Sequence, residues 1–117
     1  MVDVWEGVEL NHGHIFIPYN NKIADITHAD INLHTLDLAA ALPETRKIIM
    51  VILRVTRMAG TGELWVWPNE GALQVIPQQG YGPFDIVIAD GTQRLQYQLS
   101  VANDDFDVYC LGYVVEA

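Results

Sequence analysis

The stretch "KIIMVILRVTRM", residues 47–58, decides the fold class, because its apolar residues alternate with the two-residue period of a β-strand. One face is expected to carry the apolar side chains of Ile49, Val51, Leu53 and Val55. The other face is expected to begin apolar and end polar, through Ile48, Met50, Ile52, Arg54 and Thr56. The strand is therefore predicted to be buried on both faces at its start and on one face at its end.

Shorter segments of strand character follow this central strand. They are residues 63–67, 72–76, 84–90, 94–101 and 107–115, and they are separated by turn-forming stretches such as "AGTG", "PNEG", "PQQGYGP", "ADGT" and "ANDD". In residues 94–101 the side chains expected to face inward are Leu95, Tyr97, Leu99 and Val101. The pattern predicts an all-β fold, an antiparallel β-sandwich or jelly roll of about eight strands. A short helix within "LDLAAAL", residues 36–42, is the weaker alternative to a loop there.

The chain of 117 residues is long enough for one domain. Residues 1–25 have no sustained period and are predicted to form an N-terminal arm with one short strand, Ile15–Pro18. Residues 26–117 are predicted to form the β-sandwich. Within it, "ITHADINLHTLDL" is expected to be extended, with Ile31 and Leu33 in the apolar set and a bend at Thr35.

Composition and charge exclude several classes of function. A net charge of −9 repels phosphate backbones, so neither nucleic acid nor an anionic membrane surface is an expected partner. The longest apolar run, residues 48–53, is far shorter than the roughly 20 residues that cross a bilayer. No secretory signal is visible at the start, which fits synthesis in a cytoplasm. The single cysteine, Cys110, lies in an apolar strand pattern and is expected to be an inert structural thiol.

The sequence offers little support for catalysis. Ser100 lies outside any G-x-S-x-G turn, and the glycine pairs in "AGTGE" and "QGYGP" match no phosphate-binding loop. The chain is therefore not expected to be an enzyme or to bind a cofactor.

Two groups of residues have the chemistry of metal ligands without a specific spacing. His12 and His14 form an H-x-H pair, for which His28, His34 or Asp25 would have to supply a third ligand. Asp104, Asp105 and Asp107 could hold calcium, but they lack the pattern of an EF-hand loop. Surface histidines and a solvated acidic turn are the favoured interpretations, so no metal is expected.

Trp65 and Trp67 lie two residues apart in a predicted strand, so they share a face with about 7 Å between them. Aromatic rings at that spacing can stack on successive sugar rings, which makes these residues candidates for carbohydrate binding. The favoured alternative is that the indole pair covers the core or a subunit interface.

The last predicted strand, residues 107–115, has two apolar faces. Val108, Cys110 and Val114 are expected to face the core, with Gly112 marking a bulge or a close approach. Tyr109, Leu111, Tyr113 and Val115 are expected to form a second apolar face. A strand with two such faces is either central in its sheet or gives one face to another subunit, and Tyr109 and Tyr113 are the interface candidates.

Three stretches resemble a known family when they are taken in order: "TLDLAAALPETRKIIMVILRVT", then "LWVWPNEG", then "FDVYCLGYVVE". They are similar to the β-sandwich modules of structural proteins in tailed bacteriophages, among them capsid decoration (cement) proteins, head fibres and tail proteins. The match covers roughly residues 34–115. The family pattern has a Leu-Asp-Leu strand before a proline-containing loop and a long apolar strand. A strand then ends near Arg- or Trp-Pro-Asn-x-Gly, and the module closes on Asp-Val- or Asp-Ile-Tyr-x-x-Gly-Tyr.

The resemblance implies a jelly-roll-like fold, assembly as a homotrimer and a role in the virion rather than in catalysis. It leads us to expect a decoration protein, made in the host cytoplasm and bound to the major capsid protein on the capsid surface. The roughly 30 residues before the match are too few for a fibre shaft, which favours decoration over a fibre. The arm is expected to contact the shell through Trp5, Ile15, Ile17 and Tyr19. The alternative is a carbohydrate- or receptor-binding module of a tail or fibre, using Trp65 and Trp67.

Overall fold

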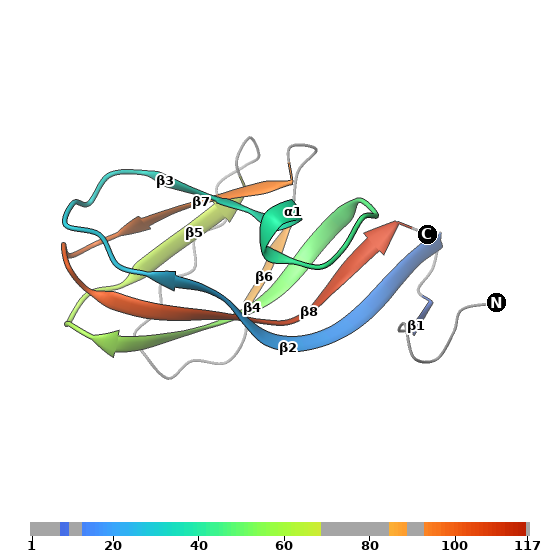
Figure 1. Ribbon diagram of the computed structural model, residues 1–117, viewed down its shortest axis with the longest axis horizontal. Helices are drawn as coiled ribbons and strands as arrows, with labels where there is room; N and C mark the ends of the chain where they lie inside the picture. The colour runs from blue at the N-terminus through green and yellow to red at the C-terminus, as the bar shows by residue number, and fades with distance from the viewer. Residues whose placement is uncertain (1–7, 10–12, 69–84, 89–92, 117) are drawn as a thin grey trace.

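The computed structural model describes residues 8–9, 13–68, 85–88 and 93–116, and it confirms the all-β class. One antiparallel sheet has the order β1-β2-β8-β4-β6, and a second has the order β3-β7-β5 (Figure 1). The first sheet contains β1 (Val8–Glu9), β2 (His14–Ile26), β8 (Asp105–Glu116), β4 (Ile48–Ala59) and β6 (Asp85–Ile88). The second contains β3 (His34–Asp37), β7 (Arg94–Leu99) and β5 (Leu64–Pro68). The predicted strand at residues 72–76 lies outside the described residues.

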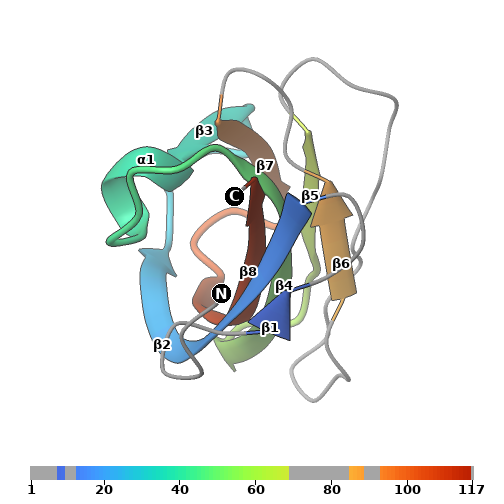
Figure 2. The ribbon, with the colours of Figure 1, turned by 90° about the vertical axis from the view of Figure 1, so that its right-hand side faces the viewer.

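The chain passes from one sheet to the other with each successive strand from β2 to β8. As a result β8 pairs with β2 on one side and with β4 on the other, although most of the chain separates β2 from β8. Figure 2 looks along the strands and shows β3 and β7 across the molecule from β2. Both sheets contribute to one hydrophobic core, whose buried members are Ile15, Ile26, Leu38, Leu42, Ile48, Val51, Leu53, Val55, Leu64, Val66, Leu95, Leu99, Phe106, Val108, Cys110, Tyr113 and Val115.

The central strand β4 forms where it was predicted, but its first residues face differently. Val51, Leu53 and Val55 are buried as expected. At the start of β4 the buried residue is Ile48, whereas Ile49 is only half-buried. The register against β8 shifts between Ile48 and Met50, and such a bulge exchanges the two faces of the strand.

The strand predicted at Ile15–Pro18 forms, but it is longer than predicted and begins at His14. The strand β2 runs through to Ile26 and pairs with β8 from His14↔Glu116 to Ile26↔Phe106. The polar run of residues 20–22 hides this strand in the sequence, and the register shifts there, with Asn20 at a φ of 55°. The remaining arm residues 1–7 and 10–12 lie outside the described part of the chain.

The segment predicted to be extended from residue 26 is interrupted by a loop. β2 ends at Ile26, β3 begins at His34, and residues 27–33 connect them. A single helical turn, α1 (Leu38–Ala41), then forms, and the Asp37 side chain accepts a hydrogen bond from the Ala39 N–H at 3.0 Å. The sequence pattern predicted a short helix here only as the weaker alternative to a loop. In the described residues no helix has the length and apolar character needed to cross a membrane.

Three loops lie together at one end of the molecule, on the left of Figure 1: residues 27–33, 60–63 and 100–104. We call this the loop end. The buried Asp104 carboxylate accepts a 2.6 Å hydrogen bond from the Gly62 N–H. Gly60, at a φ of 104°, passes so close to this carboxylate that a Cβ there would overlap it. These contacts explain why the turn "AGTG" needs its glycines.

Candidate functional site

Trp65 and Trp67 share the outer face of the three-stranded sheet, as predicted. They alternate with the buried Leu64 and Val66, and both indoles are partly exposed. The β5–β7 register places Gln98 opposite Trp65 and Gln96 opposite Trp67. Thr35 on β3 lies opposite Gln96 and completes a row across the sheet. We call Thr35, Trp65, Trp67, Gln96 and Gln98 the tryptophan face.

Hydrogen bonds fix two side chains of the tryptophan face. The Trp65 indole N–H donates to Glu63 Oε2 at 3.0 Å. The Gln98 amide donates to the Ile31 carbonyl at 2.8 Å, across to the loop at residues 27–33. The face therefore combines oriented aromatic surface with amide and hydroxyl groups, which can bond to a polar ligand such as a sugar.

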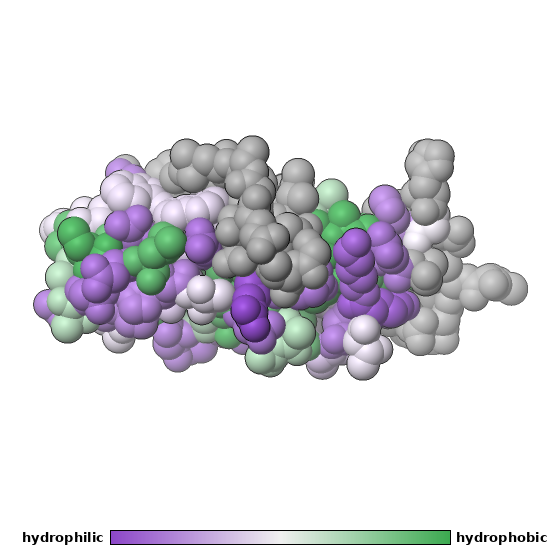
Figure 3. Space-filling view, turned by 90° about the horizontal axis from the view of Figure 1, so that it is seen from above, coloured by the Kyte–Doolittle hydropathy of each residue, from purple (hydrophilic) through white to green (hydrophobic). Residues whose placement is uncertain are grey.

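The loop end carries every large apolar side chain that is exposed in the described residues. These are Ile31 at 50% exposure, Leu33 at 48%, Met58 at 58% and Val101 at 42%. We call these four residues the loop-end surface, and Figure 3 shows hydrophobic side chains among hydrophilic ones at this end. Ile31, Leu33 and Val101 were expected in apolar strand faces, but they belong to loops because β2 ends at Ile26 and β7 at Leu99.

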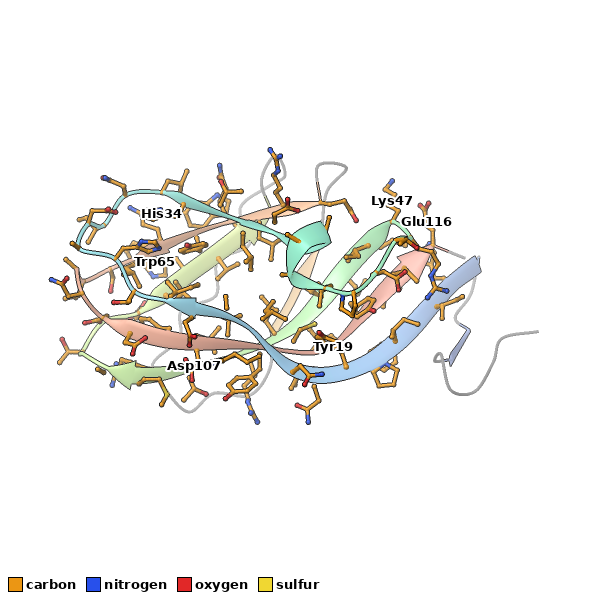
Figure 4. The ribbon with its side chains drawn as sticks, viewed as in Figure 1. Tyr19, His34, Lys47, Trp65, Asp107 and Glu116 are labelled. Atoms are coloured by element: carbon orange, nitrogen blue, oxygen red, sulfur yellow. The ribbon has the colours of Figure 1, made fainter. Side chains whose placement is uncertain are left out.

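A cluster of three rings and one carboxylate lies beneath the loop at residues 27–33. The His28 and His34 imidazoles are stacked, with centroids 3.7 Å apart and planes at 8°. Tyr97 of β7 lies beside both rings, and its hydroxyl is 2.9 Å from His28 Nε2. Asp30 Oδ1 is 2.9 Å from His34 Nε2 (His34 is labelled in Figure 4). We call these four residues the histidine cluster.

The surroundings of the histidine cluster shift the pKa values of Asp30 and Tyr97. The hydrogen bond from His34 and that from the Asn32 N–H lower the pKa of the Asp30 carboxyl. Burial, and then the charge of Asp30, raises the pKa of Tyr97. No local sequence pattern predicts this cluster, and His28 and His34 were considered only as possible third ligands of a metal ion. Tyr97 was correctly expected to face inward, but only the β3–β7 pairing, in which His34 lies opposite Tyr97, reveals the cluster.

Most of the interface candidates lie in or against the core. Ile15 is buried, Ile17 and Tyr19 pack against the core, and Trp5 lies outside the described residues. Tyr113 is 3% exposed and meets the Tyr19 ring edge-on at 6.0 Å (Tyr19 is labelled in Figure 4).

The last strand therefore does not have the predicted faces. Tyr113 and Val115 join the core, whereas the ring of Tyr109 lies beneath the Arg54 guanidinium at 5.0 Å. The cause is a register shift between β4 and β8 at residues 110–112, which exchanges the two faces partway along β8. Of the two tyrosine candidates, Tyr109 is the one that is partly exposed.

Beside Tyr113 lies an ion pair that the sequence analysis did not anticipate. The Arg46 guanidinium donates from Nε to Glu44 Oε2 and from Nη2 to Glu44 Oε1, both at 3.0 Å. Arg46 holds the pKa of the Glu44 carboxyl below its ordinary value. Burial, followed by the negative charge of Glu44, raises the pKa of Tyr113 to about 12.

The metal-ligand candidates do not converge. His14 pairs with Glu116 at the far end of β2 from His28 and His34, and His12 lies outside the described residues. Asp104 is engaged by Gly62, whereas Asp107 lies opposite Asp25 on the β2–β8 ladder, close to Lys22. In the part of the chain that the structure describes, no three histidine, cysteine or acidic side chains are placed to hold a metal ion.

The carboxyls of Asp25 and Asp107 lie opposite each other on the β2–β8 ladder. Their mutual hydrogen bond raises the pKa of Asp107 and lowers that of Asp25, whose carboxylate also receives a 3.0 Å bond from Lys22 Nζ. Cys110 is buried, and burial raises the pKa of its thiol to about 11. A thiol with this pKa is a poor nucleophile at neutral pH, which agrees with the structural interpretation.

Comparison with protein-family models found no match, and neither did the searches of curated proteins and of solved structures. The evidence for function therefore comes from the residues of this chain. Its strongest surface features are the loop-end surface, the tryptophan face and the histidine cluster.

Proposed function

We propose that the protein is a virion structural protein, a capsid decoration protein that binds the outer surface of a phage capsid as a trimeric knob. The sequence resemblance over residues 34–115 supports this proposal, since its three stretches contribute β3, β4, β5 and β8. Its partners are then the major capsid protein and two further copies of the chain. It is made in the host cytoplasm and resides on the capsid surface.

The proposal includes a jelly-roll arrangement of the two sheets. In a jelly roll, two antiparallel sheets are formed by a chain that moves repeatedly between them. The alternation of β2 to β8 between the sheets, with β2 beside β8, supports this arrangement. The short β1 and β6 then lie at the two edges of the larger sheet.

The observation that carries the proposal is the loop-end surface. A monomeric soluble domain commonly exposes single apolar residues, but here all four exposed large ones lie at one end of the described molecule. Burying such a surface against a capsid subunit would stabilise the complex by the hydrophobic effect. Three copies of a weak contact in a trimer would add to one stable attachment.

The test is co-sedimentation of the purified protein with capsids of the phage that encodes it, together with its mass in solution. A double variant, Ile31→Ser with Leu33→Ser, is expected to lose most of the binding because it removes half of the loop-end surface. Lys47→Ser is the matched control, an exposed residue on the loop before β4, away from the loop end (labelled in Figure 4). A monomer at micromolar concentration that does not sediment with capsids would refute the proposal.

The tryptophan face favours a second candidate, a carbohydrate-binding module. Its two indoles are partly exposed and have glutamine amides opposite them on β7. Positions two residues apart on a strand repeat at about 7 Å, which suits stacking on successive sugar rings. The net charge of −9 favours an uncharged glycan over an acidic one.

Glycan binding measured on Trp65→Ala and on Trp67→Ala tests this candidate. Each variant is expected to weaken binding by roughly tenfold or more, because each removes one stacking surface. Tyr109→Ala is the control, since it removes a partly exposed aromatic ring from the other sheet. A change of oligomeric mass in the tryptophan variants, without any glycan binding by the original protein, would show instead that the face is a subunit interface.

A further inference from the structure

The histidine cluster joins the two ends of the loop that carries half of the loop-end surface. His28 lies near the start of the loop at residues 27–33, and His34 is the first residue of β3 after it. Ile31 and Leu33 lie between them and are exposed. The stacking of the two imidazoles therefore sets the shape of this loop.

Among the described residues, three further hydrogen bonds involve this loop. The Asn103 N–H donates to the His28 carbonyl at 2.7 Å, and the Gln98 amide donates to the Ile31 carbonyl. Within the loop, the Asn32 N–H donates to Asp30 Oδ1 at 2.9 Å. In each of these three hydrogen bonds the donor is a neutral N–H group. The acceptor is a backbone carbonyl in two of them and the Asp30 carboxylate in the third.

Stacking at 3.7 Å suits two imidazoles of which at most one is protonated. The described contacts bring two titratable groups to the pair, Asp30 from the loop and Tyr97 from β7. The Asp30 carboxylate balances one positive charge, on His34. In the described residues His28 Nε2 bonds to the neutral Tyr97 hydroxyl, and the Asp30 carboxylate, whose charge also acts on His28, is already bonded to His34. Two positive rings would therefore share one carboxylate and repel each other in parallel contact.

We propose that the histidine cluster is an acid-operated release for the loop at residues 27–33: protonation of both His28 and His34 separates the stacked rings and frees the loop. Imidazole is the side chain that gains its proton in mildly acidic solution. The closed loop is therefore present at neutral pH and is lost as the pH falls. The regulatory role rests on the proposed function, since the released loop carries Ile31 and Leu33 away from the surface that binds the capsid.

Backbone amide exchange tests the release directly, without any partner. Between about pH 7.5 and about pH 5, exchange in residues 27–33, corrected for its intrinsic pH dependence, is expected to rise roughly tenfold relative to β4. His28→Gln keeps a polar side chain but cannot take the second charge, so exchange in its loop is expected not to change with pH. His34→Gln should also abolish the change, and His14→Gln, at the far end of β2, should leave it intact.

Two results would overturn the proposal. One is loop exchange in the original protein that stays constant over this pH range. The other is a pH-dependent rise that persists in both His28→Gln and His34→Gln. Capsid co-sedimentation at the two pH values separates this inference from the proposed function: loop release without capsid binding at either pH rejects the capsid role and leaves the release established.

Discussion

Two tyrosines at different places in the molecule each lie beside a hydrogen-bonded carboxylate, and the two sites differ in the side chain that binds this carboxylate. Tyr113 lies beside Glu44, which is held by Arg46, and Tyr97 lies beside His34, which is held by Asp30. Arginine stays charged at every pH at which proteins fold, whereas histidine gains and loses its proton near neutrality. The first site therefore has a permanently charged partner for its carboxylate, and the proposed acid release belongs to the second site alone.

The two sites also differ in how deeply they are buried. Tyr113 is a member of the core on β8, between β2 and β4, whereas Tyr97 is partly exposed under a loop. Opening the first site would disrupt the larger sheet, but opening the second would free a few loop residues. Segments of low local stability, such as this loop, are the segments that usually move in proteins.

Replacing each tyrosine with alanine gives the largest expected effects. Tyr113→Ala is expected to lower the free energy of unfolding by about 3 to 5 kcal/mol, because it leaves a large cavity in the core. Tyr97→Ala should cost about 1 to 2 kcal/mol, since its ring is only partly covered. Urea unfolding at neutral pH measures both, and equal losses would remove the distinction between the two sites.

Gly112 precedes Tyr113 at the register shift that turns this tyrosine inward. A Cβ at Gly112 would lie 2.6 Å from the Phe16 ring and 3.0 Å from the Ile17 carbonyl oxygen. Gly112→Ala is therefore expected to lower the free energy of unfolding by about 1 to 3 kcal/mol.

The pair Phe16→Ala and Gly112→Ala checks the cause of that loss. In a Phe16→Ala background the alanine at position 112 should cost much less, because the ring it meets is gone. An undiminished cost in the double variant would place the strain in the backbone instead.

Glu44→Gln gives the smallest of these effects. It tests whether the ion pair of Glu44 and Arg46 keeps its contribution to stability as the pH falls from neutral. It is expected to cost about 1 kcal/mol at neutral pH, because it removes one charge of a hydrogen-bonded ion pair. The pKa of Glu44 is lowered on folding, so its contribution is complete above its ordinary pKa and is lost as the pH falls through the lower, folded value. The difference between Glu44→Gln and the original protein should therefore hold from neutral pH down to about pH 5 and vanish in stronger acid. A difference that already fades between about pH 7 and about pH 5 would contradict this assignment.

The sequence was sufficient for the class of fold and for the simplest strand faces. Regular alternation correctly predicted the buried Leu95 and Leu99 and the shared face of Trp65 and Trp67. It failed on β8, because a single extra residue at a bulge reverses every later side chain, and apolar residues on both faces gave no sign of it. It failed on β2 because Asn20, Asn21 and Lys22 resemble a loop in isolation, and only pairing with β8 makes them part of a strand.

The candidate sites show the same limit. Trp65 and Trp67 lie along one strand, so local spacing was enough to find this pair. Thr35, Gln96 and Gln98 join them only through the pairing of β3, β7 and β5. The histidine cluster depends on β3 lying beside β7 and on the end of β2 at Ile26, which no local pattern specifies. Ile31 and Leu33 were expected in a strand face for the same reason, and they are exposed because the strand has already ended.

The position of β8 between β2 and β4 also has a consequence for how the molecule folds. The two flanking strands precede β8 in the chain, yet neither can complete its hydrogen bonds in the larger sheet until β8 arrives. Closing such long chain segments is slow, and all-β proteins with distant pairings fold in roughly milliseconds to seconds. Until then β2 and β4 have open edges that can pair with other chains. Docking of β8 is therefore the step that closes these edges.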